Sequence, residues 1–273
     1  MSVTTEESLL PELVRRCAAS GFDLVGAALA EDFDSSQPAG RRARDLDPRC
    51  GTLVVLATAA RDAWERLHAH VPLPLAAEPG ARAARGAARA LGELCGWLAD
   101  RSVRARAVQA HGLPPINLPQ LAELSGLGIV SPVIGQLLHP VYGPWVALHA
   151  ALLVEGRPFG ARFPRAVEAT FQPCTTCAAP CAAACPGETY ADRQRADLRR
   201  CAQHRHQGHC ASHCDVRRAC PIGSEHRFPG EEEARRQAVQ WARFRRFYGF
   251  GPWRMLPVRL RQGPWAGGPP PRS

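Results

Sequence analysis

Cysteine is concentrated in one short part of this chain, and that concentration constrains the fold more than any other feature. Eight of the 11 cysteines lie between Cys174 and Cys220, and the other three are scattered at Cys17, Cys50 and Cys95. Dense cysteine in a cytosolic protein is typical of a metal or metal-cluster site, because disulfides are rare in a reducing compartment. The three scattered cysteines have no neighbouring base that would make them nucleophiles, so we expect them to be packing residues.

The chain carries no signal for export or for a membrane. Its N-terminus, MSVTTEESLLPELVRR, is polar and acidic where a secretory signal would be basic and then apolar. It also has no run of about 18 apolar residues, the length that a membrane-spanning helix needs. We therefore expect a cytoplasmic protein that does not contact a membrane.

The spacing of the eight clustered cysteines favours two [4Fe–4S] clusters, which take four thiolate ligands each. Cys185 and Cys220 are each followed by proline, and in two-cluster ferredoxins the cysteine of such a pair ligates the other cluster. The alanine-rich segments between the cysteines would let the backbone come close to a bulky cluster. The predicted ligands are Cys174, Cys177, Cys181 and Cys220 for one cluster and Cys185, Cys201, Cys210 and Cys214 for the other.

Structural zinc or a single cluster is the alternative for this block. The spacing departs from the bacterial ferredoxin run C-x2-C-x2-C-x3-C-P, because the second gap here has three residues and the later run is C-x3-C-x5-C-P. Histidines, which are common zinc ligands, also lie close by. They are more often solvated than ligating, so we assign none of them to a metal: His204, His206, His209, His213 and His226.

The formal net charge of +9 is weak evidence for an acidic partner. The chain has no lysine, so all 34 basic side chains are arginine, which suggests the codon bias of a GC-rich genome. Residues 234–254 interleave arginine with aromatic side chains, a combination that can pair phosphates and stack bases in tRNA. We favour instead an amphipathic helix that packs its aromatic side chains and turns its arginines to solvent.

Hydrophobic periodicity predicts both helices and strands along the chain. The most apolar segments are short runs of the kind found in buried strands, and the clearest amphipathic pattern is the helix that carries Cys95. The predicted helices are residues 5–19, 81–101, 120–125 and 231–248, and the predicted strands are residues 22–27, 51–57 and 145–154.

The order of several short motifs resembles one known family. GFDLVGAA stands near the start, SGLG follows at residues 125–128, and HPVYGPWVALHAALLV follows at residues 139–154, before the cysteine block. This order resembles the epoxyqueuosine reductases and their relatives among corrinoid iron–sulfur enzymes, which include reductive dehalogenases. A Gly-x-Gly pattern alone would be weak evidence, and the resemblance depends on the whole order.

The resemblance implies an α+β fold in three parts. A nitroreductase-like, cobalamin-processing-type domain would occupy residues 1–170, and a double-cluster ferredoxin-like domain residues 171–225. A C-terminal helix with a Gly/Pro/Arg tail would occupy residues 226–273. It also implies cobalamin beside two [4Fe–4S] clusters, with the corrin near Gly126, Gly128, Tyr142 and Gly143, where glycine lets the backbone approach a flat ligand.

The activity that the resemblance implies is reductive. Electrons would come from a ferredoxin- or flavodoxin-type donor and reduce a small molecule or a modified nucleoside. The family's acidic proton donor has no counterpart in residues 109–114, where His111 is the only group that titrates near neutral pH, so His111 is the candidate catalytic residue. The glycine loop also differs from the family, since IVSPVIGQ follows SGLG. A non-catalytic electron-transfer or cofactor-docking protein is therefore the alternative, and a zinc-stabilised interaction protein is a further one.

Overall fold

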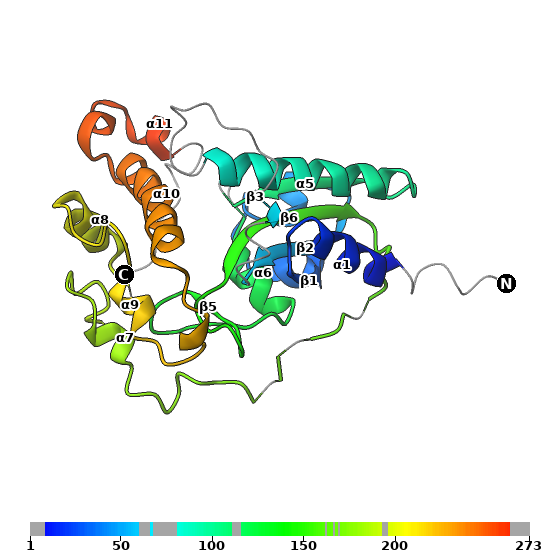
Figure 1. Ribbon diagram of the computed structural model, residues 1–273. Coiled ribbons are helices and arrows are strands. Elements are labelled where there is room, and N and C mark those ends of the chain that lie inside the picture. The colour runs from blue at the N-terminus through cyan, green and yellow to red at the C-terminus, as the bar shows by residue number, and fades with distance from the viewer. Residues whose placement is uncertain are drawn as a thin grey trace. The chain divides into compact units, whose positions relative to one another are not determined.

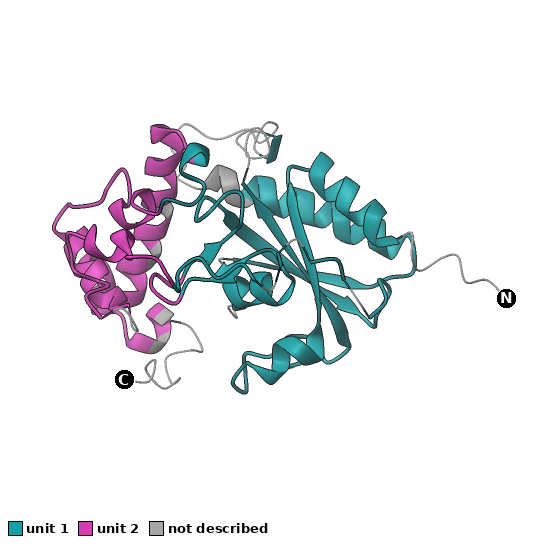
Figure 2. Cartoon of the chain, turned by 90° about the horizontal axis from the view of Figure 1, so that it is seen from below, with its two compact units in different colours: residues 1–131, 136–175, 221–226 teal, residues 132–135, 176–220, 227–273 magenta. Residues whose placement is uncertain are grey.

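The computed structural model describes residues 9–59, 66–67, 81–110, 116–161, 163–165, 167–168, 170–192 and 196–262. The chain divides into two compact units, coloured separately in Figure 2. Unit 1 comprises residues 1–131, 136–175 and 221–226, and unit 2 comprises residues 132–135, 176–220 and 227–273.

Unit 1 is built on a four-stranded antiparallel sheet with the strand order β1-β2-β6-β3. Strand β2 is almost wholly buried, β6 is buried over residues 150–154, and their register pairs Val54 with Leu152. A second, two-stranded ribbon pairs β4 with β5. The strands are β1 (Leu24–Leu29), β2 (Cys50–Thr58), β3 (Ala105–Gln109), β4 (Ile129–Val130), β5 (Leu137–Leu138) and β6 (Ala147–Glu155).

Helices cover both faces of the four-stranded sheet, which explains the continuous apolar runs of β2 and β6. Successive side chains of a strand point to opposite faces. Val54 and Leu56 accordingly join the core under α1 (Leu9–Ala19) and α5 (Ala81–Ala99), whereas the alternate residues of β2 join the core under the shorter helices. Figure 1 shows α5 above the sheet and α6 below it. The shorter helices are α2 (Ala30–Ser35), α3 (Ala43–Leu46) and α6 (Leu118–Leu124).

Unit 2 consists of helices and the cysteine-bearing loops between them. Its longest element, α10, has three glutamates in its first turn, which suits the positive N-terminal end of the helix dipole. It ends at Gly249, whose φ of 73° is the left-handed conformation that glycine adopts readily at a helix end. The elements are α7 (Pro180–Ala183), α8 (Leu198–His206), α9 (Asp215–Arg218), α10 (Gly230–Tyr248), η2 (Gly251–Met255) and α11 (Val258–Gln262); η1 (Ser224–His226) belongs to unit 1.

The structure confirms a mixed fold of helices and sheet, and each predicted helix and strand has a counterpart. Strand β3 was not predicted, because its sequence ARAVQ alternates arginine with small side chains and lacks the apolar run of the central strands. Cys17 and Cys50 are buried and Cys95 packs at the edge of the core, so their predicted packing role is confirmed. Burial raises the pKa of the Cys17 and Cys50 thiols to about 12. Within the described residues, no helix has the length and hydropathy of a membrane span.

Candidate metal centre

All eight clustered cysteines lie in the described part of the chain, and none of them forms a disulfide. Cys174 belongs to unit 1, at whose boundary it lies, and the other seven belong to unit 2. Thiols that form no disulfide while grouped this densely are available as metal ligands.

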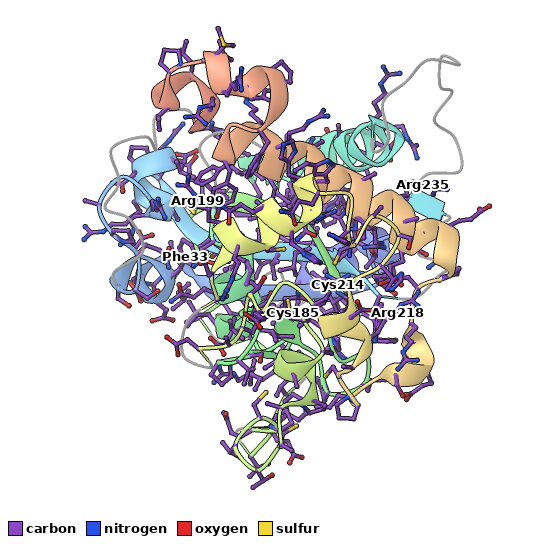
Figure 3. All side chains as sticks on the ribbon, turned by 90° about the vertical axis from the view of Figure 1, so that its left-hand side faces the viewer. Phe33, Cys185, Arg199, Cys214, Arg218 and Arg235 are labelled. Atoms are coloured by element: carbon purple, nitrogen blue, oxygen red, sulfur yellow. The ribbon has the colours of Figure 1, made fainter. Side chains whose placement is uncertain are left out.

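Four of these thiols share one neighbourhood in unit 2, and they are the predicted second ligand set. Burial, together with the nearby thiols of Cys214, Cys185 and Cys210, raises the pKa of Cys201 to about 11, against the lowering effect of Arg205. Burial also raises the pKa of Cys210, again with Cys214 and Cys185 as neighbours. Interactions of this kind weaken with distance, so the four thiols share one neighbourhood. Figure 3 labels Cys185 and Cys214 of this set.

The backbone of the loops turns sharply at the cysteines. Cys210 itself has a φ of 53°, and Ala179 and Glu188 have φ values of 56° and 49°, in the left-handed region that non-glycine residues rarely adopt. Two of these turns aim an amide at sulfur: the N–H of Ala179 donates to Cys177 Sγ and that of Thr189 to Cys185 Sγ, both at 3.4 Å. Amide donors of this kind stabilise thiolates and help to set cluster potentials.

Cysteines of both predicted sets lie on or beside two short helices. Cys181 lies on α7, with Cys185 just beyond the end of that helix. Helix α9 begins directly after Cys214 and ends two residues before Cys220. Because α7 packs against α9, one cysteine of each set lies at or beside each helix of the pair. In unit 1, the Cys174 sulfur lies 3.5 Å from the hydroxyl oxygen of Ser131.

Buried arginine accompanies the second set. Arg205 is 6% exposed, and its Nη1 donates to Oε1 of Gln240 at 2.9 Å. Burial lowers its pKa, and the thiols of Cys201, Cys210 and Cys214 act in the opposite direction. A buried guanidinium needs a compensating negative charge, which thiolates or an anionic cluster would supply. The buried guanidinium therefore fits an anionic metal site made of these thiolates.

The described thiols share a neighbourhood, but their side chains are not arranged around a common metal position. Across the described residues, no group of three or more Cys, His, Asp or Glu side chains is arranged to hold a metal ion. The nearby histidine rings of His204 and His209 stack on each other, with centroids 4.2 Å apart. Within the described part of the chain, the lack of a group arranged to hold a metal applies to iron and zinc alike.

The glycines predicted to line a corrin face the chain's own atoms instead. A Cβ on Gly126 would lie 2.8 Å from the Cβ of Arg165, and one on Gly128 would meet the carbonyl oxygen of Leu138. At Gly143, where φ is 53°, it would meet the carbonyl oxygen of Ile222. These three positions lack the open backbone surface that a flat ligand would occupy, so they do not fit a corrin in that way.

The other predicted site residues are Tyr142 and His111. The ring of Tyr142 lies edge-on to His226, with centroids 4.8 Å apart, in a small aromatic cluster with His139. His111 lies outside the described residues. Their predicted roles stay predictions.

His139 has a structural role that sequence reasoning missed. It is 6% exposed, and its Nδ1 accepts the amide protons of Val141 at 3.1 Å and Tyr142 at 3.3 Å. A protonated ring has no acceptor, so this turn requires neutral histidine. Burial, and to a smaller extent the nearby His226, lowers the pKa of His139 from 6.5 to about 4.

A pH-dependent loss of stability is therefore expected. The unfolded chain takes up the His139 proton more readily than the folded chain, so stability should fall as the pH drops from about 6.5 towards 4. Urea midpoints measured across this range should show that slope, and His139→Asn, which keeps an acceptor but does not titrate, should reduce it. His206→Asn, at an exposed ring, is the control. An unchanged slope in His139→Asn would contradict the assignment.

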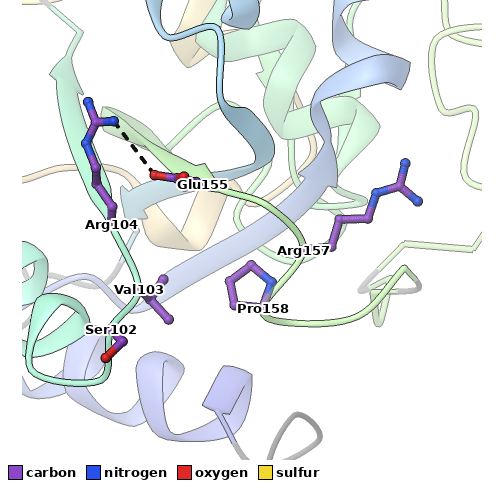
Figure 4. Close-up of a pocket in the computed structure, with 6 residues that line it drawn as sticks. All are labelled: Ser102, Val103, Arg104, Glu155, Arg157 and Pro158. Carbon is purple, nitrogen blue, oxygen red and sulfur yellow. Dashed lines mark ion pairs between the residues drawn. The ribbon is translucent and has the colours of Figure 1, made fainter.

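A polar pocket of about 540 Å³ lies at another part of unit 1 (Figure 4). Arg104 and Arg157 line it, and both are already paired: Arg104 with Glu155 at 3.7 Å and Arg157 with Glu31 at 2.8 Å. An anion would have to compete with these carboxylates, so the pocket offers no evident reaction site.

The C-terminal helix packs its tryptophan as expected. Trp241 on α10 lies near the ring of Phe250, with centroids 6.0 Å apart, and the guanidinium of Arg205 lies 5.8 Å from its ring centre. Arg235 and Arg246 on the same helix are exposed, whereas the side chain of Arg236 is 14% exposed and Phe247 is 44% exposed. The helix therefore follows the expected amphipathic pattern only in part.

Comparison with solved structures identifies the fold. An epoxyqueuosine reductase solved with a tRNA-Tyr epoxyqueuosine-modified stem loop superposes with a TM-score of 0.57 and 17% identity, over 83% of this chain and 68% of that one. The reductase from Streptococcus thermophilus gives 0.57 and 12%, over 87% and 82%. This chain has the fold of the epoxyqueuosine reductases. The resemblance seen in the sequence motifs is thereby confirmed at the level of the fold.

A catabolic reductive dehalogenase, NpRdhA, shares the epoxyqueuosine reductase-like fold more distantly. It superposes with a TM-score of 0.50 and 19% identity, over 82% of this chain. The match covers only 33% of the dehalogenase chain. No protein-family model matches the chain, and no curated protein matches it.

Proposed function

We propose that this protein is an iron–sulfur oxidoreductase of the epoxyqueuosine reductase type. Two [4Fe–4S] clusters in the ferredoxin-like part would carry electrons to a cofactor in the N-terminal part, for reduction of a small molecule or a modified nucleoside. The observation that carries the proposal is the shared neighbourhood of the second thiol set in a chain with this fold. The domain limits proposed for these parts are residues 1–170 and 171–225.

The chain's own residues would hold and tune the clusters. Cys185, Cys201, Cys210 and Cys214 would ligate one, and Cys174, Cys177, Cys181 and Cys220 the other. A bound cluster supplies one-electron transfer. The amides that donate to Cys177 and Cys185 would hold those sulfurs as thiolates, and Arg205 would offset the negative charge of the second cluster.

Cobalamin is the cofactor that the family resemblance implies for the N-terminal part. His111 remains the proposed proton donor, and a ferredoxin- or flavodoxin-type protein in the cytoplasm the proposed electron donor. Gly126, Gly128 and Gly143 lend the corrin no support, since the chain's own atoms fill their open sides.

That same observation favours a second candidate, an iron–sulfur electron relay or docking protein without a corrin. Such a protein would carry the same clusters and would be reduced without turning over a substrate. The two candidates differ in one measurement: the absorption spectrum of added cob(II)alamin should shift with the reductase and stay unchanged with the relay.

Metal analysis tests the proposal common to both candidates. Protein purified or reconstituted without oxygen should contain about eight irons and eight sulfides per chain, because each cubane holds four of each. The reduced protein should show the electron paramagnetic resonance (EPR) signal of [4Fe–4S]⁺. One or two zincs per chain, with no sulfide, would instead establish a zinc-stabilised interaction protein.

A further inference from the structure

One carboxylate of unit 2 lies deep in the protein and touches a predicted cluster ligand. The side chain of Glu233, on α10, is 1% exposed. Its Oε1 accepts the backbone N–H of Cys214 at 3.2 Å. Its Oε2 accepts two bonds from the guanidinium of Arg218, from Nε at 3.0 Å and from Nη2 at 2.7 Å.

These bonds hold helix α9 at its first turn. Cys214 is the N-cap residue of α9, and its own side chain makes no capping bond. The carboxylate from α10 accepts the backbone N–H of Cys214 itself, at the start of the helix. At the other end of α9, the carbonyl oxygen of Arg218 accepts Nη2 of Arg227 at 2.7 Å. Contacts from outside therefore fix both ends of the short helix between Cys214 and Cys220.

The burial of Glu233 has a cost that its three bonds must offset. A carboxylate taken out of water is strongly destabilised unless charged partners and hydrogen bonds surround it. A helix N-terminus could be capped by an uncharged serine or asparagine of its own, with no buried ion pair. An ion pair in this position places two opposite charges, which largely cancel, beside the ligand set.

We propose that Glu233 is a positioning residue for the cluster held by Cys185, Cys201, Cys210 and Cys214. It would fix the backbone of Cys214, and hence its sulfur, and would balance Arg218 so that the pair contributes little net charge at the cluster. The inference rests on the proposed iron–sulfur function. It adds a role for a residue that is not itself a ligand.

The chain provides a matched control in the neighbouring residue. Glu232 is also buried, at 6% exposed, and also pairs with an arginine, accepting from Arg236 Nε at 2.9 Å and from Nη2 at 2.6 Å. Arg236 lies over the ring of Phe228, 3.8 Å from its centre. No described bond links Glu232 to a cysteine, so the two glutamates differ in their contact with the ligand.

The test compares reduction potentials in the reconstituted full-length protein. Reduction adds negative charge to a cluster, so Glu233→Gln, which leaves Arg218 unbalanced, should shift one of the two reduction steps to a more positive potential. Arg218→Gln, which leaves the carboxylate unbalanced, should shift the same step to a more negative potential. The EPR signal of that cluster should change in both variants. Glu232→Gln should lower thermal stability and leave potentials and signal unchanged.

Each outcome decides the inference. Opposite shifts of one step support it. If both Glu233→Gln and Arg218→Gln keep the wild-type potentials and signal, or if Glu232→Gln shifts them equally, Glu233 is a structural residue only. If either Glu233→Gln or Arg218→Gln does not fold, the sign of the potential shift in the other variant still supports or overturns the inference. Wild-type protein without iron would overturn the proposed function itself, a result seen before any variant is made.

Discussion

The variant Cys201→Ser is expected to retain about four irons per chain in place of about eight. Cys201 lies on α8 with the thiols of Cys185, Cys210 and Cys214 as its neighbours, so its loss should leave the second cluster without a complete ligand set. A serine hydroxyl is a hard ligand and binds cluster iron much more weakly than a thiolate. The measurement is iron and sulfide per folded chain after anaerobic reconstitution.

Cys95→Ser is the control for this prediction. Cys95 lies on α5 of unit 1 and packs at the edge of the core, far in sequence from the cysteine block. Its loss should leave the iron content near eight. If Cys201→Ser and the wild type contain equal amounts of iron per chain, Cys201 is not a cluster ligand.

EPR spectra of reconstituted variants test whether neighbouring cysteines ligate different clusters. Cys181 and Cys185 lie on and just after one short helix, yet they are assigned to different clusters. Cys185→Ser should therefore leave the same residual EPR signal as Cys201→Ser, and Cys181→Ser should leave the other signal. If Cys181→Ser and Cys185→Ser give one signal, the clusters take their ligands in sequence order.

The central strands could be predicted from the sequence because burial on both faces leaves an uninterrupted apolar run. The edge strand β3 could not, since Arg106 and its small neighbours give no such run. The cysteine block and its Cys-Pro pairs are local patterns that the sequence shows directly, whereas the division of the eight cysteines into two ligand sets stays a prediction. In the structure, the four thiols of the second set share one neighbourhood.

The contacts made across the chain could not be predicted in the same way. Glu233 is the last of three consecutive glutamates, and nothing in the sequence separates it from Glu231 or Glu232. Only the packing of α10 against the cysteine region distinguishes them. Gly143 likewise fits a cofactor loop in local sequence, and the segment that fills its open side, Ile222–Gly223, lies beyond the whole cysteine block.

Gly143→Ala is expected to be the most destabilising of three glycine substitutions. Its φ of 53° costs an alanine about 1–2 kcal/mol. Its Cβ would also meet the carbonyl of Ile222, and overpacking of this kind costs about 1–3 kcal/mol more. Two controls separate these effects. Gly135→Ala has the left-handed φ, 64°, with open space around it, and Gly128→Ala meets the carbonyl of Leu138 at an ordinary φ.

The glycine variants also distinguish a packing role from a cofactor role. If Gly143 serves packing against Ile222, the free energy of unfolding, measured with denaturant, should fall most in Gly143→Ala and by smaller amounts in the two controls. The response of added cob(II)alamin to folded protein should then be the same in Gly143→Ala as in wild type. If Gly143→Ala instead keeps wild-type stability and loses a spectral shift that the wild type shows, the glycine borders a bound corrin. The contact with Ile222 would then have to open when the corrin binds.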